Sequence, residues 1–277
     1  MRSGRRGEGA ELVGLREYRR GDDLRRVDQR ATARASRARG TDVLLVREFY
    51  AEEAARVVLV LDRRPSMRLF PARFPWLRKP AAVREIVRLV VDSAFEQQAP
   101  VGCLTVGAAG GIVWSPPARR PHTAEWVDEA ADAAPVDSLA RVFAALGRLP
   151  RLGKGTFVFV VSDFLEPPDE EAWWRLLARG WDPVPVVVQD PVWEQSFPAV
   201  AGVPLPVADA GGARAMLVRL TRREAVALSA VHQARFKTML QRLRALTLEP
   251  ICVGADDRAS VHAEFQRWAA ARAGRLR

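Results

Sequence analysis

Five short apolar runs recur along this chain of 277 residues, and they limit its fold more than any other feature. Each is five or six residues long and rich in β-branched side chains, as expected for strands buried on both faces. Segments with apolar residues at three- and four-residue spacing lie between them, which is typical of helices that cover a sheet. The alternation predicts an α/β fold of three layers, a mostly parallel sheet flanked by helices with right-handed crossovers. The predicted strands are 57–61, 101–106, 156–161, 183–188 and 249–254.

The helical segments carry recognisable ends. Asp137 and Asp169 stand at the starts of two of them, where a carboxylate caps backbone N–H groups and faces the positive end of the helix dipole. Gly180 follows its helix, as expected for a C-terminal stop. The predicted helices lie within 78–98, 123–134, 137–149, 169–180 and 221–246.

Two parts of the chain do not follow the alternation. Residues 1–55 form a basic lead-in that contains the run TDVLLVREFY, a candidate strand or hairpin. Residues 56–277 form the α/β domain, and within it residues 189–220 are rich in Pro, Gly and Val. We expect that stretch to be an irregular insertion with one or two short strands.

The positive charge of the chain is concentrated at one end. The formal net charge is +10, and residues 1–40 hold 12 arginines against 6 acidic residues. An arm of this kind suits phosphates, an anionic membrane surface or an acidic protein face.

The two cysteines, Cys103 and Cys252, lie in apolar runs, which favours reduced and packed thiols over a disulfide framework. No apolar stretch is long enough for a secretory signal or a membrane span, so we expect a cytoplasmic protein.

Polar residues follow two of the predicted strands. Asp62 ends the first strand and is followed by Ser66, and Asp163 ends the third. The carboxyl ends of parallel strands are where such folds bind ligands, and these hard oxygen atoms suit Mg²⁺. An aspartate after a buried strand is also a common helix cap, so the spacing leaves both interpretations open.

Longer motifs resemble a known family. The lead-in EYRRGDDLRRVDQRATARAS, the stretch VREFYAEEAARVVLVLDRRPSM and the strand FVFVVSDFL resemble the bacterial domain-of-unknown-function family 58 (DUF58), whose core is similar to a von Willebrand factor type A domain, itself Rossmann-like. Gln29 stands where that family usually has tryptophan. The matching lead-in positions are Tyr18, Gly21, Asp22, Asp23, Arg25, Asp28, Ala33 and Arg34.

This resemblance implies a metal-ion-dependent adhesion site, in which two aspartates, two serines and a threonine hold Mg²⁺. Asp62 matches the first aspartate, Ser66 the second serine and Asp163 the third-loop aspartate. Arg64 replaces the first serine, and Asp137, or Ser138 one position later, stands where the threonine is expected. The implied site is therefore degenerate.

Arg64 suggests how such a site could work without an ion. A guanidinium is a permanent cation with donors that match carboxylate geometry, so Arg64 is predicted to neutralise Asp62, Asp137 and Asp163 or to meet a partner's acidic group. The alternative is Mg²⁺ bound through Asp62, Ser66 and Asp137 or Asp163; otherwise we expect no cofactor.

The segment GDDLRRVDQRATAR alternates acids and arginines, and two interpretations stay open. It forms either a solvated, salt-bridged surface with capped turns or a docking face. The residues concerned are Asp22, Asp23, Arg25, Asp28, Arg30 and Arg34.

Catalytic motifs are missing from the sequence: it has no Gly-rich phosphate loop, no serine elbow and no His and Cys ligand pattern. We therefore expect a non-enzymatic protein-interaction module. The resemblance implies an adaptor or co-chaperone that works with a MoxR-type AAA+ ATPase, since such proteins are commonly encoded together. The alternative is a nucleic-acid or anionic-surface binder that uses the N-terminal arginines.

Overall fold

The computed structural model describes residues 6–19, 22–23, 25, 27–41, 43–50, 56–68, 77–128, 133–149, 152–208 and 215–275. The chain divides into two compact units, Met1–Ala55 and Arg56–Arg277. Tyr18, Asp22, Asp23, Arg25 and Asp28 of the lead-in are described, whereas position 21 lies outside the described residues.

The N-terminal unit consists of one pair of strands and one helix. Strand β1 (Arg6–Glu17) runs antiparallel to β2 (Leu45–Tyr50), and α1 (Gln29–Arg39) lies between them in the sequence. Asp28 caps α1 by accepting a hydrogen bond from the backbone N–H of Ala31, and Gly40 ends it at a φ of 67°, a conformation that glycine adopts easily. The helix was not predicted, because the many arginines of α1 leave it without an apolar stripe of core width.

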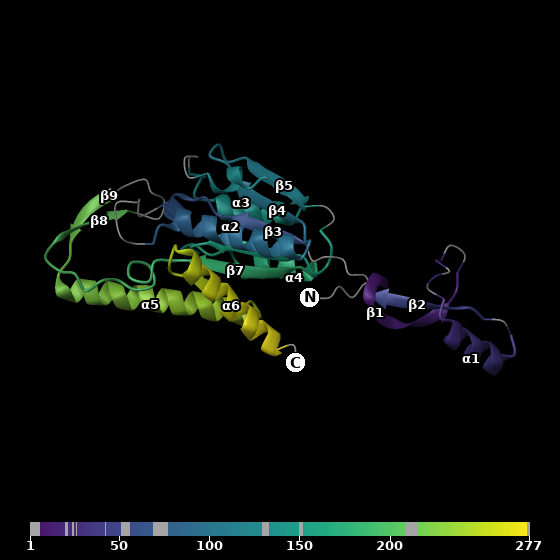
Figure 1. Ribbon diagram of the computed structural model, residues 1–277. Helices are drawn as coiled ribbons and strands as arrows, with labels where there is room; N and C mark the ends of the chain where they lie inside the picture. Colours follow the sequence, from purple (N-terminus) through teal and green to yellow (C-terminus); the bar gives the residue numbers. More distant parts are fainter. Residues whose placement is uncertain are drawn as a thin grey trace. The chain divides into compact units, whose positions relative to one another are not determined.

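The larger unit is built on a six-stranded sheet (Figure 1). Its order is β10-β7-β6-β3-β4-β5, parallel throughout except for the antiparallel edge strand β5. The predicted α/β fold is therefore confirmed. The strands are β3 (Val57–Leu61), β4 (Val101–Val106), β5 (Ile112–Ala118), β6 (Phe157–Ser162), β7 (Asp182–Val188) and β10 (Ile251–Val253).

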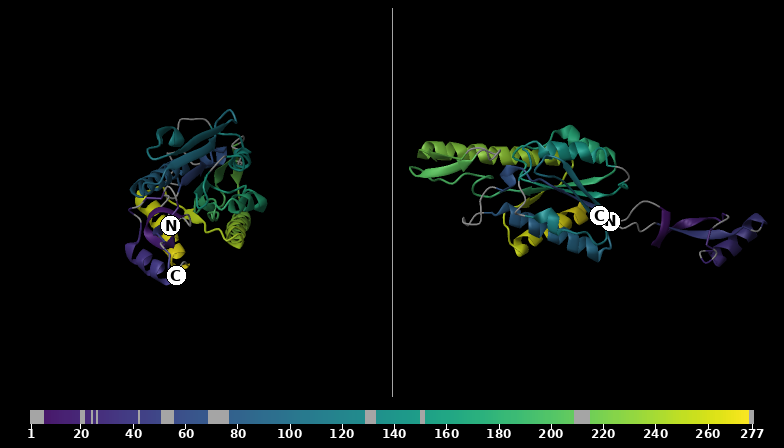
Figure 2. Two further views of the ribbon diagram at one scale, coloured as in Figure 1. Left: turned by 90° about the vertical axis from the view of Figure 1, so that its right-hand side faces the viewer. Right: turned by 90° about the horizontal axis from the view of Figure 1, so that it is seen from above.

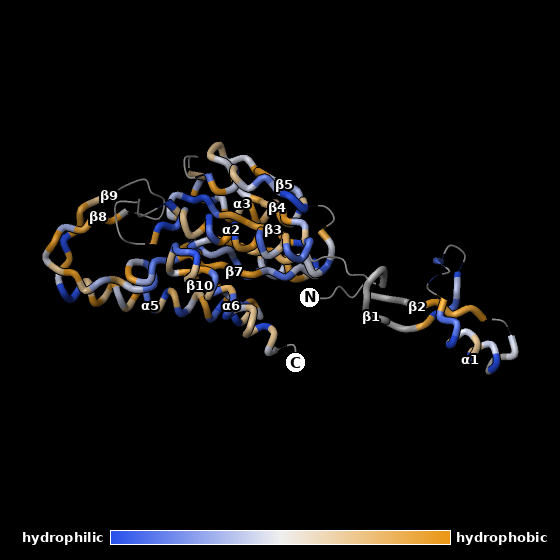
Figure 3. Tube along the Cα trace, viewed as in Figure 1, coloured by the Kyte–Doolittle hydropathy of each residue, from blue (hydrophilic) through white to orange (hydrophobic). Residues whose placement is uncertain are grey.

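Helices cover both faces of the sheet, which gives three layers (Figure 2). Val58, Val160 and neighbours with the same orientation form a core with α3, α4 and the C-terminal part of α5. On the other face lie α2 and α6, where the Phe159 ring contacts the rings of Phe265 and Trp268. Figure 3 shows hydrophobic residues gathered on the central strands. The helices are α2 (Lys79–Glu96), α3 (Ser138–Leu146), α4 (Glu170–Ala178), α5 (Arg222–Ala245) and α6 (Arg258–Arg275).

The predicted helix ends are reproduced in one helix and altered in another. Asp169 caps α4 by accepting from the backbone N–H of Ala172, and Gly180 follows at a φ of 70°. Asp137 stands at the N-cap position of α3 but forms no capping hydrogen bond there.

Three segments differ from the sequence-based expectation. The described part of 123–134 forms a short 3-10 helix, Ala124–Val127, instead of an α-helix. Strand β5 was missed because its exposed face and its two prolines hide the pattern of a buried strand. Within 189–220, where one or two short strands were expected, β8 (Pro204–Ala208) and β9 (Ala215–Arg219) pair in antiparallel fashion, but the stretch that precedes them belongs to the site described below.

Both cysteines are free, and burial raises the pKa of Cys103 above its ordinary value and that of Cys252 to about 11. None of the described helices is long and apolar enough to cross a bilayer.

Candidate functional site

The polar residues at the strand ends, Asp62, Arg64 and Asp163, form a cluster where the strand connections diverge. From β3 the chain crosses to β4 on one side of the sheet, and it later returns to β6 on the other side. In doubly wound sheets this switch point is the usual place for a ligand. Asp62 directly follows β3 and Asp163 directly follows β6, and because Leu61 pairs with Val161, Asp163 lies one residue beyond the level of Asp62. The ends of the two strands thus bring Asp62 and Asp163 within reach of one side chain, Arg64.

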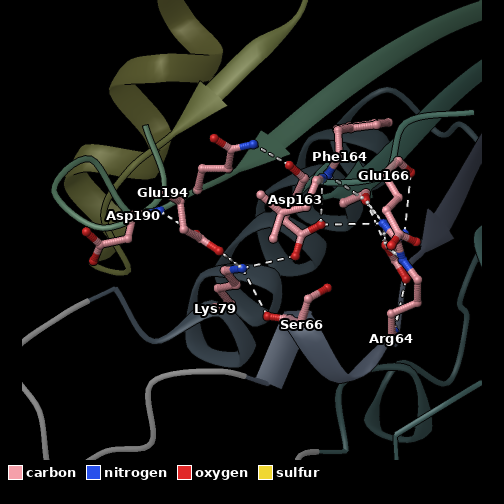
Figure 4. Close-up of polar contacts among 12 residues, drawn as sticks. Arg64, Ser66, Lys79, Asp163, Phe164, Glu166, Asp190 and Glu194 are labelled. Atoms are coloured by element: carbon pink, nitrogen blue, oxygen red, sulfur yellow. Dashed lines mark hydrogen bonds and ion pairs between the residues drawn. The ribbon is translucent and has the colours of Figure 1, made fainter. Parts of the chain in front are cut away.

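Arg64 points into the cluster (Figure 4). Its backbone N–H donates to Asp62 Oδ1 at 3.0 Å, and its Nε and Nη2 lie 2.9 and 2.8 Å from Asp62 Oδ2. Nη2 also lies 3.3 Å from Ser162 Oγ and 3.4 Å from Asp163 Oδ1, while Nη1 reaches Glu166 Oε2 at 3.4 Å. The side chain of Arg64 is only 5% exposed, so it faces the aspartates and not solvent.

Lys79 supplies a second cation, which the sequence analysis missed. It is the first residue of α2 and is fully buried. Its Nζ donates to the backbone oxygen of Ser66 at 3.0 Å, to Asp163 Oδ2 at 3.0 Å and to Glu194 Oε1 at 2.5 Å. The N-terminus of a helix is the positive end of its dipole and repels a cation. The negative charges of Asp163 and Glu194 offset this repulsion.

The two aspartates differ in electrostatic environment. Burial raises the pKa of Asp62 above its ordinary value, although the Arg64 guanidinium opposes this rise. Burial also acts to raise the pKa of Asp163, but Lys79, the Ser66 hydroxyl, the Leu165 N–H and Arg64 outweigh it and leave the pKa lowered. Asp163 is therefore the carboxylate that the surroundings hold most firmly in its ionised form.

The backbone after β6 is strained to form this arrangement. Phe164 adopts a φ of 49°, in the left-handed region that bulky residues seldom occupy. Its N–H donates to Ser162 Oγ at 3.0 Å, and Ser162 Oγ in turn donates to Asp62 Oδ2 at 2.7 Å. The turn therefore ties the end of β6 to the end of β3.

The loop after β7 completes the site. Asp190 accepts hydrogen bonds from the backbone N–H groups of Leu77, Val192 and Trp193, which fixes both this loop and the start of α2. Glu194 lies on the same loop, and burial raises its pKa although Lys79 lies beside it. The sequence pattern of this stretch predicted only an irregular insertion, because nothing local in it indicates packing against α2.

Asp137 does not join the cluster, contrary to the expectation that Arg64 would neutralise it. Its side chain is 54% exposed and pairs with Arg141 at 2.8 Å, one helical turn away. Ser138, the alternative for the threonine position, is buried, and its hydroxyl has no hydrogen-bond partner among the residues that the structure describes.

The arrangement does not fit the Mg²⁺ that the resemblance implies. All four carboxylate oxygens of Asp62 and Asp163 already accept hydrogen bonds, and Arg64 and Lys79 supply positive charge at short range. Within the described parts of the chain, no group of three or more His, Cys, Asp or Glu side chains is arranged to hold a metal ion.

The acids of the proposed docking segment have local partners. Asp22 accepts two hydrogen bonds from Arg16, which is the main reason why its pKa falls to about 2. Asp23 accepts from the backbone N–H of Arg25, and Asp28 caps α1. The arginines Arg25, Arg30 and Arg34 are exposed.

One comparison with known proteins gives the family of the chain, and the similar solved structures are distant. A family model described as "Protein of unknown function DUF58" matches residues 14–235, and no curated protein matches. Three solved structures are similar at 14% identity: the conserved hypothetical protein BatB from Bacteroides thetaiotaomicron (TM-score 0.46), an aerotolerance-related membrane protein from Bacteroides fragilis (0.47) and an uncharacterized membrane spanning protein from Vibrio fischeri (0.23). The matches cover 78%, 78% and 77% of this chain and 99%, 99% and 96% of the other chains, respectively.

Proposed function

Because the chain belongs to the DUF58 family of proteins of unknown function, we propose that it is a non-enzymatic interaction module, an adaptor or co-chaperone of a MoxR-type AAA+ ATPase. The α/β unit would then serve as a von Willebrand factor type A-like core. Its strand-end face would bind the partner.

The pairing of the buried carboxylates with Arg64 and Lys79 carries this proposal. A general base needs an acceptor that is free to take a proton from a substrate, and a nucleophile needs a neighbouring base. The carboxylate oxygens of Asp62 and Asp163 instead accept hydrogen bonds from fixed donors within the protein. Such a cluster stiffens a surface and suits recognition better than proton transfer.

Exposed groups border this cluster and are the candidates for partner contact. Glu166 is 68% exposed and lies beside Arg64. A second loop borders the cluster, because the backbone N–H of Ala134 donates to the backbone oxygen of Arg63 at 2.8 Å. This loop carries the exposed residues Val136 and Asp137, which with Glu166 form the rim of the cluster. Since Arg64 is buried, these rim residues would make the contact, and their acids favour a basic group on the partner.

Co-purification with the ATPase tests the proposal. The tagged chain should retain a MoxR-type AAA+ ATPase from its source cells, more with a non-hydrolysable ATP analogue than with ADP. The double variant Asp137→Arg, Glu166→Arg should weaken retention about tenfold or more, because it places like charges opposite the partner. Retention would be quantified by mass spectrometry of the eluate.

The matched control is Glu170→Arg, Glu171→Arg on the exposed start of α4, which makes the same charge change and should retain the ATPase. If no MoxR-type ATPase is enriched in either nucleotide state, or both double variants lose it equally, the proposal is wrong.

A second candidate function rests on the face of α1. Arg30, Arg34 and Arg37 are spaced by four and three residues, which places them on one side of the helix, and all three are exposed. None of them pairs with an acid in the part of the chain that the structure describes. This basic face suits nucleic acid or an anionic surface.

Salt dependence distinguishes this candidate. If the three arginines meet phosphates, affinity for duplex DNA should fall about fortyfold between 50 and 200 mM salt, and deletion of residues 1–40 should abolish binding. Changing all three to Gln should reduce both affinity and salt slope in fluorescence anisotropy, and anionic vesicles provide a parallel assay. The triple variant of Arg222, Arg223 and Arg258, also to Gln, removes equal charge elsewhere and should bind normally.

A further inference from the structure

The ammonium group of Lys79 has the coordination of a bound cation. Its three N–H donors meet three oxygens, which come from the loop after β3, the end of β6 and the loop after β7. An ammonium has no more than three N–H donors, so none is left for solvent or a partner. Because the side chain is fully buried, the position is closed as well as saturated.

The carboxylates of this cluster outnumber its two cations, so the buried acids depend on the ammonium of Lys79 for charge compensation. Three carboxylates, Asp62, Asp163 and Glu194, are buried together with Arg64 and Lys79. The exposed Glu166 supplies a further negative charge at the rim. Removing the ammonium would leave three carboxylates against one guanidinium, a deficit of two positive charges.

The ligands that such a removal would release are those of a hard divalent ion. Asp163 Oδ2, Glu194 Oε1 and the Ser66 backbone oxygen are two carboxylate oxygens and one carbonyl, the donor types that Mg²⁺ and Mn²⁺ take.

We propose that Lys79 is the permanent resident cation of the strand-end site, with Arg64 beside it, and that the surrounding oxygens bind a divalent metal only when the ammonium is removed. The wild-type chain then needs no metal at this site. Glu194, which comes from the chain's own loop, supplies the third ligand to the cation. That loop is in turn held by α5, since Arg235 donates to the Glu194 backbone oxygen at 2.9 Å and His232 Nδ1 contacts the Trp193 oxygen at 3.1 Å.

The test compares wild type with Lys79→Ala in the full-length chain, by thermal unfolding in EDTA and in Mn²⁺ or Mg²⁺. The wild-type midpoint should not change with metal. The Lys79→Ala midpoint should be lower in EDTA and should rise by about 5 to 10 °C at a Mn²⁺ concentration about a hundredfold above the dissociation constant. A folded Lys79→Ala variant with no metal response would overturn the proposal.

Two controls show where the metal binds. Lys79→Ala, Glu194→Gln removes one carboxylate ligand and should lose the response, and Arg78→Ala, at the exposed neighbouring cation, should behave as wild type. A response that persists in the first control contradicts the assigned ligands.

Metal binding by the wild-type chain tests the proposal even if Lys79→Ala does not fold. Titration of Mn²⁺ followed by electron paramagnetic resonance should show no micromolar binding to wild type. Micromolar binding that Asp163→Asn abolishes would place a metal in the native site and refute the proposal. These readouts need no partner protein and are independent of the proposed function.

Discussion

Replacing Lys79 with Met is expected to lower the free energy of unfolding by about 3 to 5 kcal/mol, because it leaves buried carboxylates without their cation. Methionine keeps most of the length and apolar volume of the lysine stem, so the loss reports the ammonium and little of the packing. The ammonium contacts Asp163 and Glu194 in a fully buried position, where water cannot replace it. Urea unfolding followed by circular dichroism measures the difference.

Arg78→Met is the matched control, because Arg78 is the preceding residue and its side chain is 51% exposed. Its pair with Asp256 lies at the surface, so the change should cost less than about 1 kcal/mol. Equal effects of the two substitutions would mean that Lys79 contributes no more than a surface cation.

The fold was predictable because its signals are local. The run 57–61 is apolar at every position and 101–106 at every position except Thr105, and in the structure every residue of both is buried in a central strand. Strand β5 was not predicted because its residues are largely exposed, so its sequence lacks the apolar run of a buried strand. The segment 123–134 has helical spacing, yet its described residues form only a short 3-10 turn, since propensity yields to tertiary context.

The site was predictable only in the part that lies at strand ends. Asp62 and Asp163 follow buried strands, and parallel topology brings such positions together. Asp137 was misplaced because the position of a residue before a helix does not fix the direction of its side chain. Its contact with Arg141 within the same helix is the competing local interaction.

Lys79 and Glu194 could not be placed by local pattern, because they meet across 115 positions of the sequence. One signal was nevertheless present. The chain has 43 basic residues, of which only Lys79, Lys154 and Lys237 are lysines. Lysine is rare in this arginine-rich sequence, and Lys79 also stands at the start of a helix, where cations are disfavoured. The two features together indicate a position that requires a compact ammonium.

Asp163→Asn is expected to destabilise the chain at pH 7 by about 3 to 5 kcal/mol, since the aspartate faces both Arg64 and Lys79. Asparagine has nearly the same shape, so the loss reports the charge. The pKa of Asp163 is lowered in the folded state. Its contribution is therefore fully present above the ordinary aspartate pKa, about 3.9, and is lost as the pH falls through the folded-state pKa.

The difference in unfolding free energy between wild type and Asp163→Asn should thus be largest near neutral pH and should shrink below about pH 4. Asp62 and Glu194 have raised pKa values, so their protonation on acidification favours the folded state, but to a first approximation this cancels between the two proteins. Urea unfolding at several pH values from 7 to 3 measures the difference.

Asp137→Asn is the control for this pH series, because its exposed pair with Arg141 should contribute less than about 1 kcal/mol at every pH. A difference for Asp163→Asn that stays constant from pH 7 to 3 would show that the ionised carboxylate is not its source. In that case the contacts of Asp163 with Lys79 and Arg64 would act through shape and hydrogen bonding alone, and the cluster would not be held together by charge.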